Sequence, residues 1–169
     1  MADQPRWKGL AASGAAAITI AAALAGQWEG RKNVAYWDAY GAVWTICDGH
    51  TAGVREGDTA SDAQCDAWRE QDMSHAAASV DRCIHVPLTT LERAAFIDAA
   101  YNLGPVVVCG STLQRKANAG DVTGACLQLT DALDAKGNAV GWTHAGGKEL
   151  AGLRNRRTDE RNLCLGYLR

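Results

Sequence analysis

The chain has 169 residues, enough for one domain with a core of its own. Its formal net charge is -2, and its Lys and Arg residues form no dense block, which excludes the basic surface that nucleic-acid binding requires. We therefore expect no nucleic-acid partner.

The first predicted element is an uncharged apolar segment at residues 9–26, preceded by Arg6 and Lys8. A helix of this length spans about 27 Å, close to the roughly 30 Å of a bilayer's hydrocarbon core. The segment consists mostly of Ala and Gly, and Ala buries too little area to supply much transfer free energy. We expect it to enter a membrane but to be held there weakly.

Four fates are open to this segment. The basic residues before it and the small residues 23–26 are typical of a cleaved secretory signal. It is otherwise a permanent anchor with a cytoplasmic N-terminus, an uncleaved anchor weak enough to leave the bilayer, or a buried helix of a soluble protein. The Ala and Gly content favours the releasable anchor over a permanent span. We divide the chain into this N-terminal segment, 1–27, and a domain at 28–169.

The next predicted element is a small antiparallel hairpin region. Residues 34–51 are rich in aromatic and β-branched side chains and are broken by Gly41 and Gly49. The remainder of the chain is mostly helical in pattern, which predicts an α+β fold with one small sheet and a helical lobe.

Helix start signals divide the helical part. Ser61 and Thr89 each begin a capping pattern and are expected to open a helix. Shorter helices are expected at 111–118 and 121–133. A glycine-rich loop then leads into a last helix, expected at 148–165.

Six cysteines lie after the apolar segment: Cys47, Cys65, Cys83, Cys109, Cys126 and Cys164. An even number on one side of a membrane segment favours disulfides formed in an oxidising compartment. Buried free thiols in a cytosolic protein are the alternative. Sequence alone cannot fix the pairing, and we treat Cys47 with Cys65 and Cys126 with Cys164 as hypotheses.

Two carboxylates, Glu29 and Asp38, lie close in sequence but on different predicted elements, the end of the first helix and the hairpin. Carboxylates from two elements can face each other across a cleft, as glycoside hydrolysis requires. One protonated carboxyl gives its proton to the leaving oxygen, and the other activates water or meets the developing oxocarbenium ion. Most Asp and Glu are solvated surface charges, so this spacing alone is a weak signal.

A run of motifs surrounds these carboxylates. The chain reads WEG at 28–30, AYWD at 35–38, WTICDGHT at 44–51, YNLG at 101–104 and WTHAGGK at 142–148. In this order and density the motifs resemble the phage-type lysozymes, the endolysins of glycoside hydrolase family 24. The resemblance implies a lysozyme-like fold.

The resemblance also implies a catalytic set of Glu29, Asp38 and Thr45. Glu29 would be the general acid, and Asp38 and Thr45 would position and activate the attacking water. The chain departs from the family pattern by one extra residue between Asp38 and Thr45, which an insertion at the hairpin tip would accommodate. It also reads Cys47-Asp48-Gly49-His50 where many members read Gly-Tyr-Gly-His.

Members with a cysteine at that point often belong to the signal-arrest-release endolysins, in which an uncleaved, weakly hydrophobic helix tethers an inactive enzyme to the host inner membrane. The segment at 9–26 resembles such a helix. One branch of that class uses a catalytic Cys and a disulfide that rearranges with a Cys inside the membrane segment. Here Asp38 holds the catalytic position and no Cys precedes Cys47. Control by the position of Glu29 is therefore favoured.

Four further residues are expected to line the sugar groove: His50, Asn102, Gly104 and Trp142. Each has a structural alternative. His50 would form hydrogen bonds within the hairpin, Asn102 and Gly104 would form an ordinary helix end, and Trp142 would pack in the core.

Three arginines, Arg154, Arg156 and Arg157, are expected on a solvated helix face, with one as a candidate partner for Glu29 or for a carboxylate of the substrate peptide. The Cys and His spacings of the chain complete no recognisable metal site. We predict neither a metal nor a cofactor.

The sequence therefore predicts an endolysin that hydrolyses the β-1,4 bond between N-acetylmuramic acid and N-acetylglucosamine in peptidoglycan. It would first be tethered through residues 9–26, with its N-terminus in the cytoplasm and its domain in the periplasm, and then be released. No protein partner is indicated. The alternative is a membrane-anchored or secreted, disulfide-stapled cell-wall binding protein without catalysis.

Overall fold

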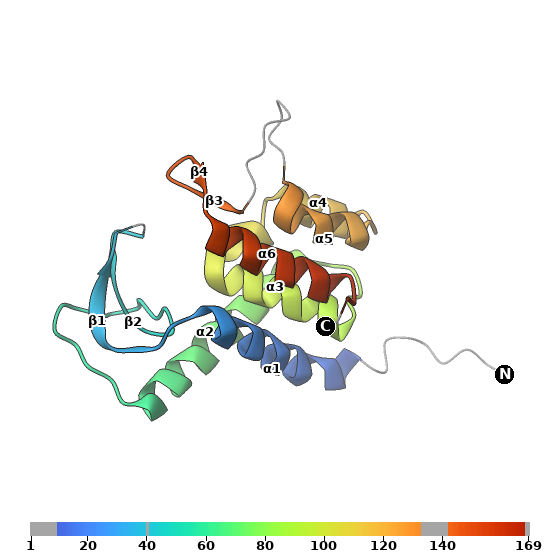
Figure 1. Cartoon of the computed structure of the whole chain (residues 1–169). Helices are drawn as coiled ribbons and strands as arrows, with labels where there is room; N and C mark the ends of the chain where they lie inside the picture. Colours follow the sequence, from blue (N-terminus) through green and yellow to red (C-terminus); the bar gives the residue numbers. More distant parts are fainter. Residues whose placement is uncertain (1–9, 40, 133–141, 168–169) are drawn as a thin grey trace.

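The computed structural model describes residues 10–39, 41–132 and 142–167, which form a small hairpin lobe and a larger helical lobe (Figure 1). The hairpin consists of β1 (Lys32–Asp38) and β2 (Val43–Cys47). The helices are α1 (Leu10–Trp28), α2 (Asp62–Cys83), α3 (Thr90–Leu103), a short 3₁₀ helix (Pro105–Val107), α4 (Thr112–Asn118), α5 (Val122–Asp131) and α6 (Ala151–Cys164). Both α1 and α2 pass from the hairpin to the helical lobe. The architecture confirms the predicted helical lobe with a small antiparallel hairpin.

The hairpin keeps its strand register past the turn. Asp38 pairs with Val43, and Tyr36 pairs with Thr45. The extra residue that the sequence holds between Asp38 and Thr45 therefore falls in the connection between the strands, where Ala42 adopts a positive φ of 51°. Thr45 thus lies opposite Tyr36.

The two predicted capping signals are confirmed. The Ser61 hydroxyl accepts a hydrogen bond from the Gln64 amide at the start of α2. At the start of α3, the Thr89 hydroxyl accepts from the Glu92 amide while the Glu92 carboxylate accepts from the Thr89 amide. Each cap satisfies amide groups that have no partner within the helix.

The last helix begins later than predicted. Gly146 and Gly147 both have positive φ, 57° and 76°, and form a tight turn between β3 (His144–Ala145) and β4 (Lys148–Glu149). Lys148 is therefore a strand residue, and α6 starts at Ala151. The part of the predicted glycine-rich loop and of the 121–133 helix at residues 133–141 lies outside the described residues.

Three disulfides tie the elements together. Cys47–Cys65 joins β2 to α2, and Cys126–Cys164 joins α5 to α6, which confirms both predicted pairs. The third bond, Cys83–Cys109, links the end of α2 to the chain after the 3₁₀ helix and was not predicted. Disulfides, and not free thiols, account for all six cysteines.

Helix α1 forms part of the helical lobe's core. Ala17, Ala21 and Ala25, spaced four residues apart, are fully buried in the same cluster as the small residues of α3. Alanine side chains let the two helix backbones approach closely. Within the part of the chain that the structure describes, no helix combines the length and apolar character needed to cross a membrane.

This close packing predicts that Ala21→Leu destabilises the protein. The added side chain has no space in the interface between α1 and the core, and overpacking of this kind costs about 1–3 kcal/mol. We expect the midpoint of thermal unfolding to fall by several degrees. The matched control is Ala16→Leu on the exposed side of α1, which should leave the midpoint unchanged. Equal midpoints for the two variants would contradict the packing described.

Candidate active site

A cavity of about 360 Å³ lies where the end of α1, the hairpin and α3 meet. Glu29, Asp38, Thr45 and Asn102, which were predicted from the sequence, all line it. The other lining residues are Tyr36, Gly41, Val43, Asp48, Gly49, Thr51 and Tyr101. The fold therefore brings the predicted catalytic set into one cavity.

Glu29 lies directly after α1. Its amide donates to the Ala25 carbonyl at 3.0 Å, so it continues the last turn of the helix. The Arg156 guanidinium donates to Glu29 Oε1. The other oxygen, Oε2, faces Gly49, where a Cβ atom would lie 3.9 Å away, and Gly49 has a φ of 103°. Glycine is suited to this position because the backbone is left-handed and the carboxylate is close.

The hairpin contributes the second wall. Tyr36 and Asp38 alternate along β1 onto one face, and Thr45 lies opposite Tyr36 on β2. Thr45 is buried, and its hydroxyl donates to the Val43 carbonyl at 3.4 Å. Asp38 folds back toward the turn, where a Cβ on Gly41 would meet Asp38 Oδ2 at 3.0 Å. The absence of a side chain at Gly41 gives this carboxylate its space.

Two tyrosines stay protonated beside the carboxylates. Burial raises the pKa of Tyr36, with the charges of Asp38 and Glu29 adding to the effect. Burial also raises the pKa of Tyr101, and Glu29 and Asp72 contribute. The Tyr101 hydroxyl donates to the Asp48 carbonyl. Both groups are therefore neutral hydrogen-bond donors in the cleft.

Arg156 and Arg157 are buried, contrary to the predicted solvated face. Arg156 is 4% exposed and binds Asp98 through two nitrogens, at 2.9 and 3.3 Å, in addition to Glu29. Burial alone would lower the pKa of Arg156, but Asp98 and Glu29 outweigh it and raise the pKa. The anionic partners explain why these arginines face inward, and the predicted pairing of one arginine with Glu29 is confirmed. Arg154 stays exposed.

The other predicted groove residues lie in different places. The imidazole of His50 is buried, with Nδ1 2.8 Å from Asp72 Oδ2, and it stacks on Trp68. Asn102 accepts from Arg157 at 3.0 Å while lining the cavity. Gly104 ends α3 with a φ of 81°.

Trp142 packs against the main core cluster. Its predicted contact with sugar stays a prediction.

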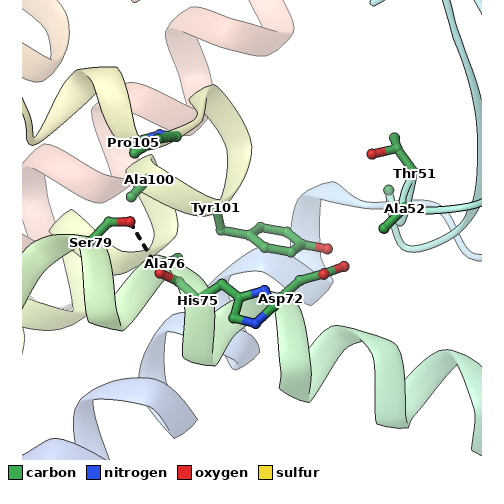
Figure 2. A pocket seen from close by; sticks show the side chains of 10 residues that line it. Thr51, Ala52, Asp72, His75, Ala76, Ser79, Ala100, Tyr101 and Pro105 are labelled. Atoms are coloured by element: carbon green, nitrogen blue, oxygen red, sulfur yellow. Dashed lines mark hydrogen bonds between the residues drawn. The ribbon is translucent and has the colours of Figure 1, made fainter.

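A second cavity of about 330 Å³ shares Gly49, Thr51 and Tyr101 with the first. Figure 2 shows Tyr101 reaching from α3 toward the loop of Thr51 and Ala52, above the side chain of Asp72 on α2. The two cavities are therefore neighbours, and Glu29 lines the first of them.

Site prediction from sequence missed Tyr36, Asp48 and Tyr101. Each stands inside one of the motifs, next to or near a predicted residue. The two-residue alternation that puts Tyr36 on the face of Asp38 was a usable signal. Asp48 and Tyr101 meet through a backbone carbonyl, which no sequence pattern marks. Among the described residues, no three His, Cys, Asp or Glu side chains gather in a metal-binding arrangement.

The chain is similar to proteins of a known family. The profile of the phage lysozyme family matches residues 26–160. The SAR-endolysin of Enterobacteria phage P21 is 38% identical over 162 residues, which cover 92% of each chain. The SAR-endolysin of Pseudomonas phage phiKMV is 40% identical over 149 residues, covering 86% of this chain and 88% of that protein.

Among solved structures, the muramidase domain of SpmX from Asticaccaulis excentricus matches with a TM-score of 0.71 and 28% identity. The match covers 86% of this chain and 94% of that domain. The lysozyme-like fold thus covers most of the chain.

Proposed function

The chain belongs to the phage lysozyme family, and we propose that it is an endolysin in which Glu29 is the general acid and Asp38 and Thr45 act on the attacking water. Family membership makes the chain a lysozyme acting on peptidoglycan, in place of the alternative of a binding protein without catalysis. The observation that carries the assignment of residues is the single cavity that holds all three side chains.

The proposed reaction is hydrolysis of the β-1,4 bond between N-acetylmuramic acid and N-acetylglucosamine. Glu29 gives its proton to the glycosidic oxygen as the bond from that oxygen to the sugar carbon breaks. Water held by Asp38 and Thr45 attacks the same carbon and gives a proton to Asp38. Arg156 holds Glu29 Oε1, which leaves Oε2 to carry the proton toward Gly49 and the cleft.

We assign the two neighbouring cavities to the glycan strand. Asn102 lines the cavity at Glu29, and Gly104 ends α3 next to Pro105, which lines the second cavity. His50 is buried against Asp72, which lines the second cavity, and would act by supporting that wall. No metal or cofactor takes part in the proposed reaction.

We further propose that residues 1–27 are a signal-arrest-release segment. The relatives named SAR-endolysin and the weakly apolar sequence at 9–26 support this assignment. Glu29 follows α1 without a linker, so α1 cannot lie in a bilayer while Glu29 sits in the cleft. In the tethered form, with the N-terminus in the cytoplasm and the domain in the periplasm, the enzyme would lack its acid. Release would let α1 pack as in this structure.

The release model predicts a soluble form with an intact N-terminus. The full chain is expressed in a Gram-negative cell, the membrane potential is collapsed with a protonophore, and the periplasmic protein is analysed by intact mass. We expect the protein to move from the membrane fraction to the periplasm at the mass of the uncleaved chain, with lysis as the consequence. A periplasmic form that has lost residues 1–25 would instead identify a cleaved signal peptide and end the release model.

A further inference from the structure

Asp48 is a buried carboxylate that the catalytic reaction does not use. It is 5% exposed and lies between the disulfide-bonded Cys47 and Gly49. An aspartate this deeply buried needs compensating partners, because desolvation of a charge is costly. Asp48 is therefore expected to have cationic partners within the fold.

Its main partner is Arg31. The guanidinium donates to both carboxylate oxygens, from Nε at 3.1 Å and from Nη2 at 2.7 Å. This two-point geometry fixes the direction of the Arg31 side chain as well as its distance. Arg69 of α2 adds a second cation at 3.5 Å.

Arg31 is separated from Glu29 only by Gly30. Two residues of chain span at most about 7 Å, so fixing Arg31 restricts where the backbone of Glu29 can lie. Arg69 also approaches this point, since its Nη1 would lie 3.8 Å from a Cβ on Gly26 in the last part of α1. The exit of α1 is therefore bounded by two arginines, both bound to Asp48.

Asp48 also reaches the cleft through its backbone, because its carbonyl accepts from the Tyr101 hydroxyl. It thus connects β2 with the segment after α1, with α2 and with α3. Arg156 holds the Glu29 side chain from α6. On the hairpin side, the chain after Glu29 is held by the side chain of Arg31 and, from Lys32 on, by pairing with β2.

We propose that Asp48 is a positioning residue, which binds Arg31 and thereby holds the end of α1 so that the Glu29 carboxylate stays in the cleft. This inference rests on the proposed role of Glu29. Small errors matter here, because a displacement of about 1 Å of a catalytic group can cost on the order of 100-fold in rate. The hydrogen bonds that Arg31 donates to Asp48 and then to Asp66 raise the pKa of Arg31, so the cation persists at any pH of interest.

The test is Asp48→Asn, which keeps the shape of the side chain and removes its charge. We expect kcat on soluble, uncrosslinked glycan strands to fall about 10- to 100-fold with KM within about twofold, because asparagine keeps the shape of the cavity wall that Asp48 lines. Amide hydrogen exchange should accelerate at residues 26–31 and stay unchanged in α3 and α5. The local exchange signal separates positioning from a general loss of folding.

The matched control is Asp66→Asn. Asp66 binds the same guanidinium at 2.7 Å but from the exposed side, and its loss leaves the Asp48 contact in place. It should retain kcat within about twofold. The proposal is overturned if Asp48→Asn keeps normal kcat, if its loss only follows the unfolded fraction, or if Asp66→Asn loses as much. The exchange measurement does not depend on catalysis, so a failure of Glu29 as the acid is detected separately, by lysis with Glu29→Gln.

Discussion

Replacing Glu29 with glutamine is expected to abolish lysis while the protein stays folded. Glutamine keeps an oxygen that can accept from Arg156, so the side chain retains its place, but its amide N–H is far too weak an acid to protonate the leaving oxygen. General acid catalysis contributes about 10²–10⁴-fold, and kcat should fall by that amount. Clearing of a suspension of permeabilised Gram-negative cells, measured as turbidity, reports the loss.

Folding of this variant is checked by its thermal midpoint and by its sedimentation with purified cell walls, which should both match the wild type. The variant separates catalysis from binding, since a bound but inactive protein does not clear the suspension. Near-normal clearing by Glu29→Gln would remove Glu29 from the mechanism.

The second large effect is expected from Arg156→Met. Arg156 binds the fully buried Asp98 and lies 3.5 Å from the fully buried Glu160. Removing the cation leaves buried carboxylates without their partner, which costs about 3–5 kcal/mol. Unfolding in urea with the disulfides intact should show this loss of stability. Arg154→Met, on the exposed neighbour that pairs with Glu149, should cost less than about 1 kcal/mol.

The loss of stability in Arg156→Met is expected to depend on pH, because Glu160 belongs to the same cluster of buried charges. Burial raises the pKa of the Glu160 carboxyl in the folded protein, so the native state binds a proton that the unfolded chain releases. This contribution to stability is present below the unfolded pKa and is lost as the pH rises through the folded pKa. Loss of Arg156 raises the pKa of Glu160 further, because the arginine's charge opposes the effect of burial. The difference in unfolding free energy between the variant and the wild type should therefore narrow from about pH 8 to about pH 5. A constant gap of under about 1 kcal/mol would show that the guanidinium is dispensable.

Local signals in the sequence predicted the elements they control. The caps at Ser61 and Thr89 define helix starts through side chains three residues apart, so they can be read directly. The predicted start of α6 was wrong because Gly146 and Gly147 form a turn whose strands are only two residues long each, below the length at which alternation is visible. The positive φ angles of this glycine pair favour a turn, and they outweigh the helix propensity of the residues that follow directly.

Site residues that lie within the recognised motifs were predicted from the sequence. Most site contacts between segments that are distant in the sequence were not. Glu29, Asp38 and Thr45 share one cavity, as the resemblance implied. The burial of Arg156 depends on Asp98, which is distant in sequence and carries no signal of its own. Asp48 likewise depends on Arg31 and Tyr101, and these three separate segments meet only in the folded chain.

Docking of α1 is a further feature that sequence left open. An Ala-rich stretch suits both a weak membrane span and close packing on another helix, since small side chains serve both. The fully buried Ala17, Ala21 and Ala25 show the packed arrangement. The release experiment tests whether α1 is first inserted in the membrane and later packs on the helical lobe.

The central claim, that this cleft cleaves the glycan with Glu29 as the acid, is tested most directly by the reducing end that digestion creates. Purified peptidoglycan is digested, reduced with borohydride, and the new sugar alcohol is identified by mass spectrometry. The wild type should yield muramitol derived from N-acetylmuramic acid, and Glu29→Gln should yield none above background. Reduced N-acetylglucosamine, a product without a reducing end, or the same muramitol yield from Glu29→Gln would contradict the account.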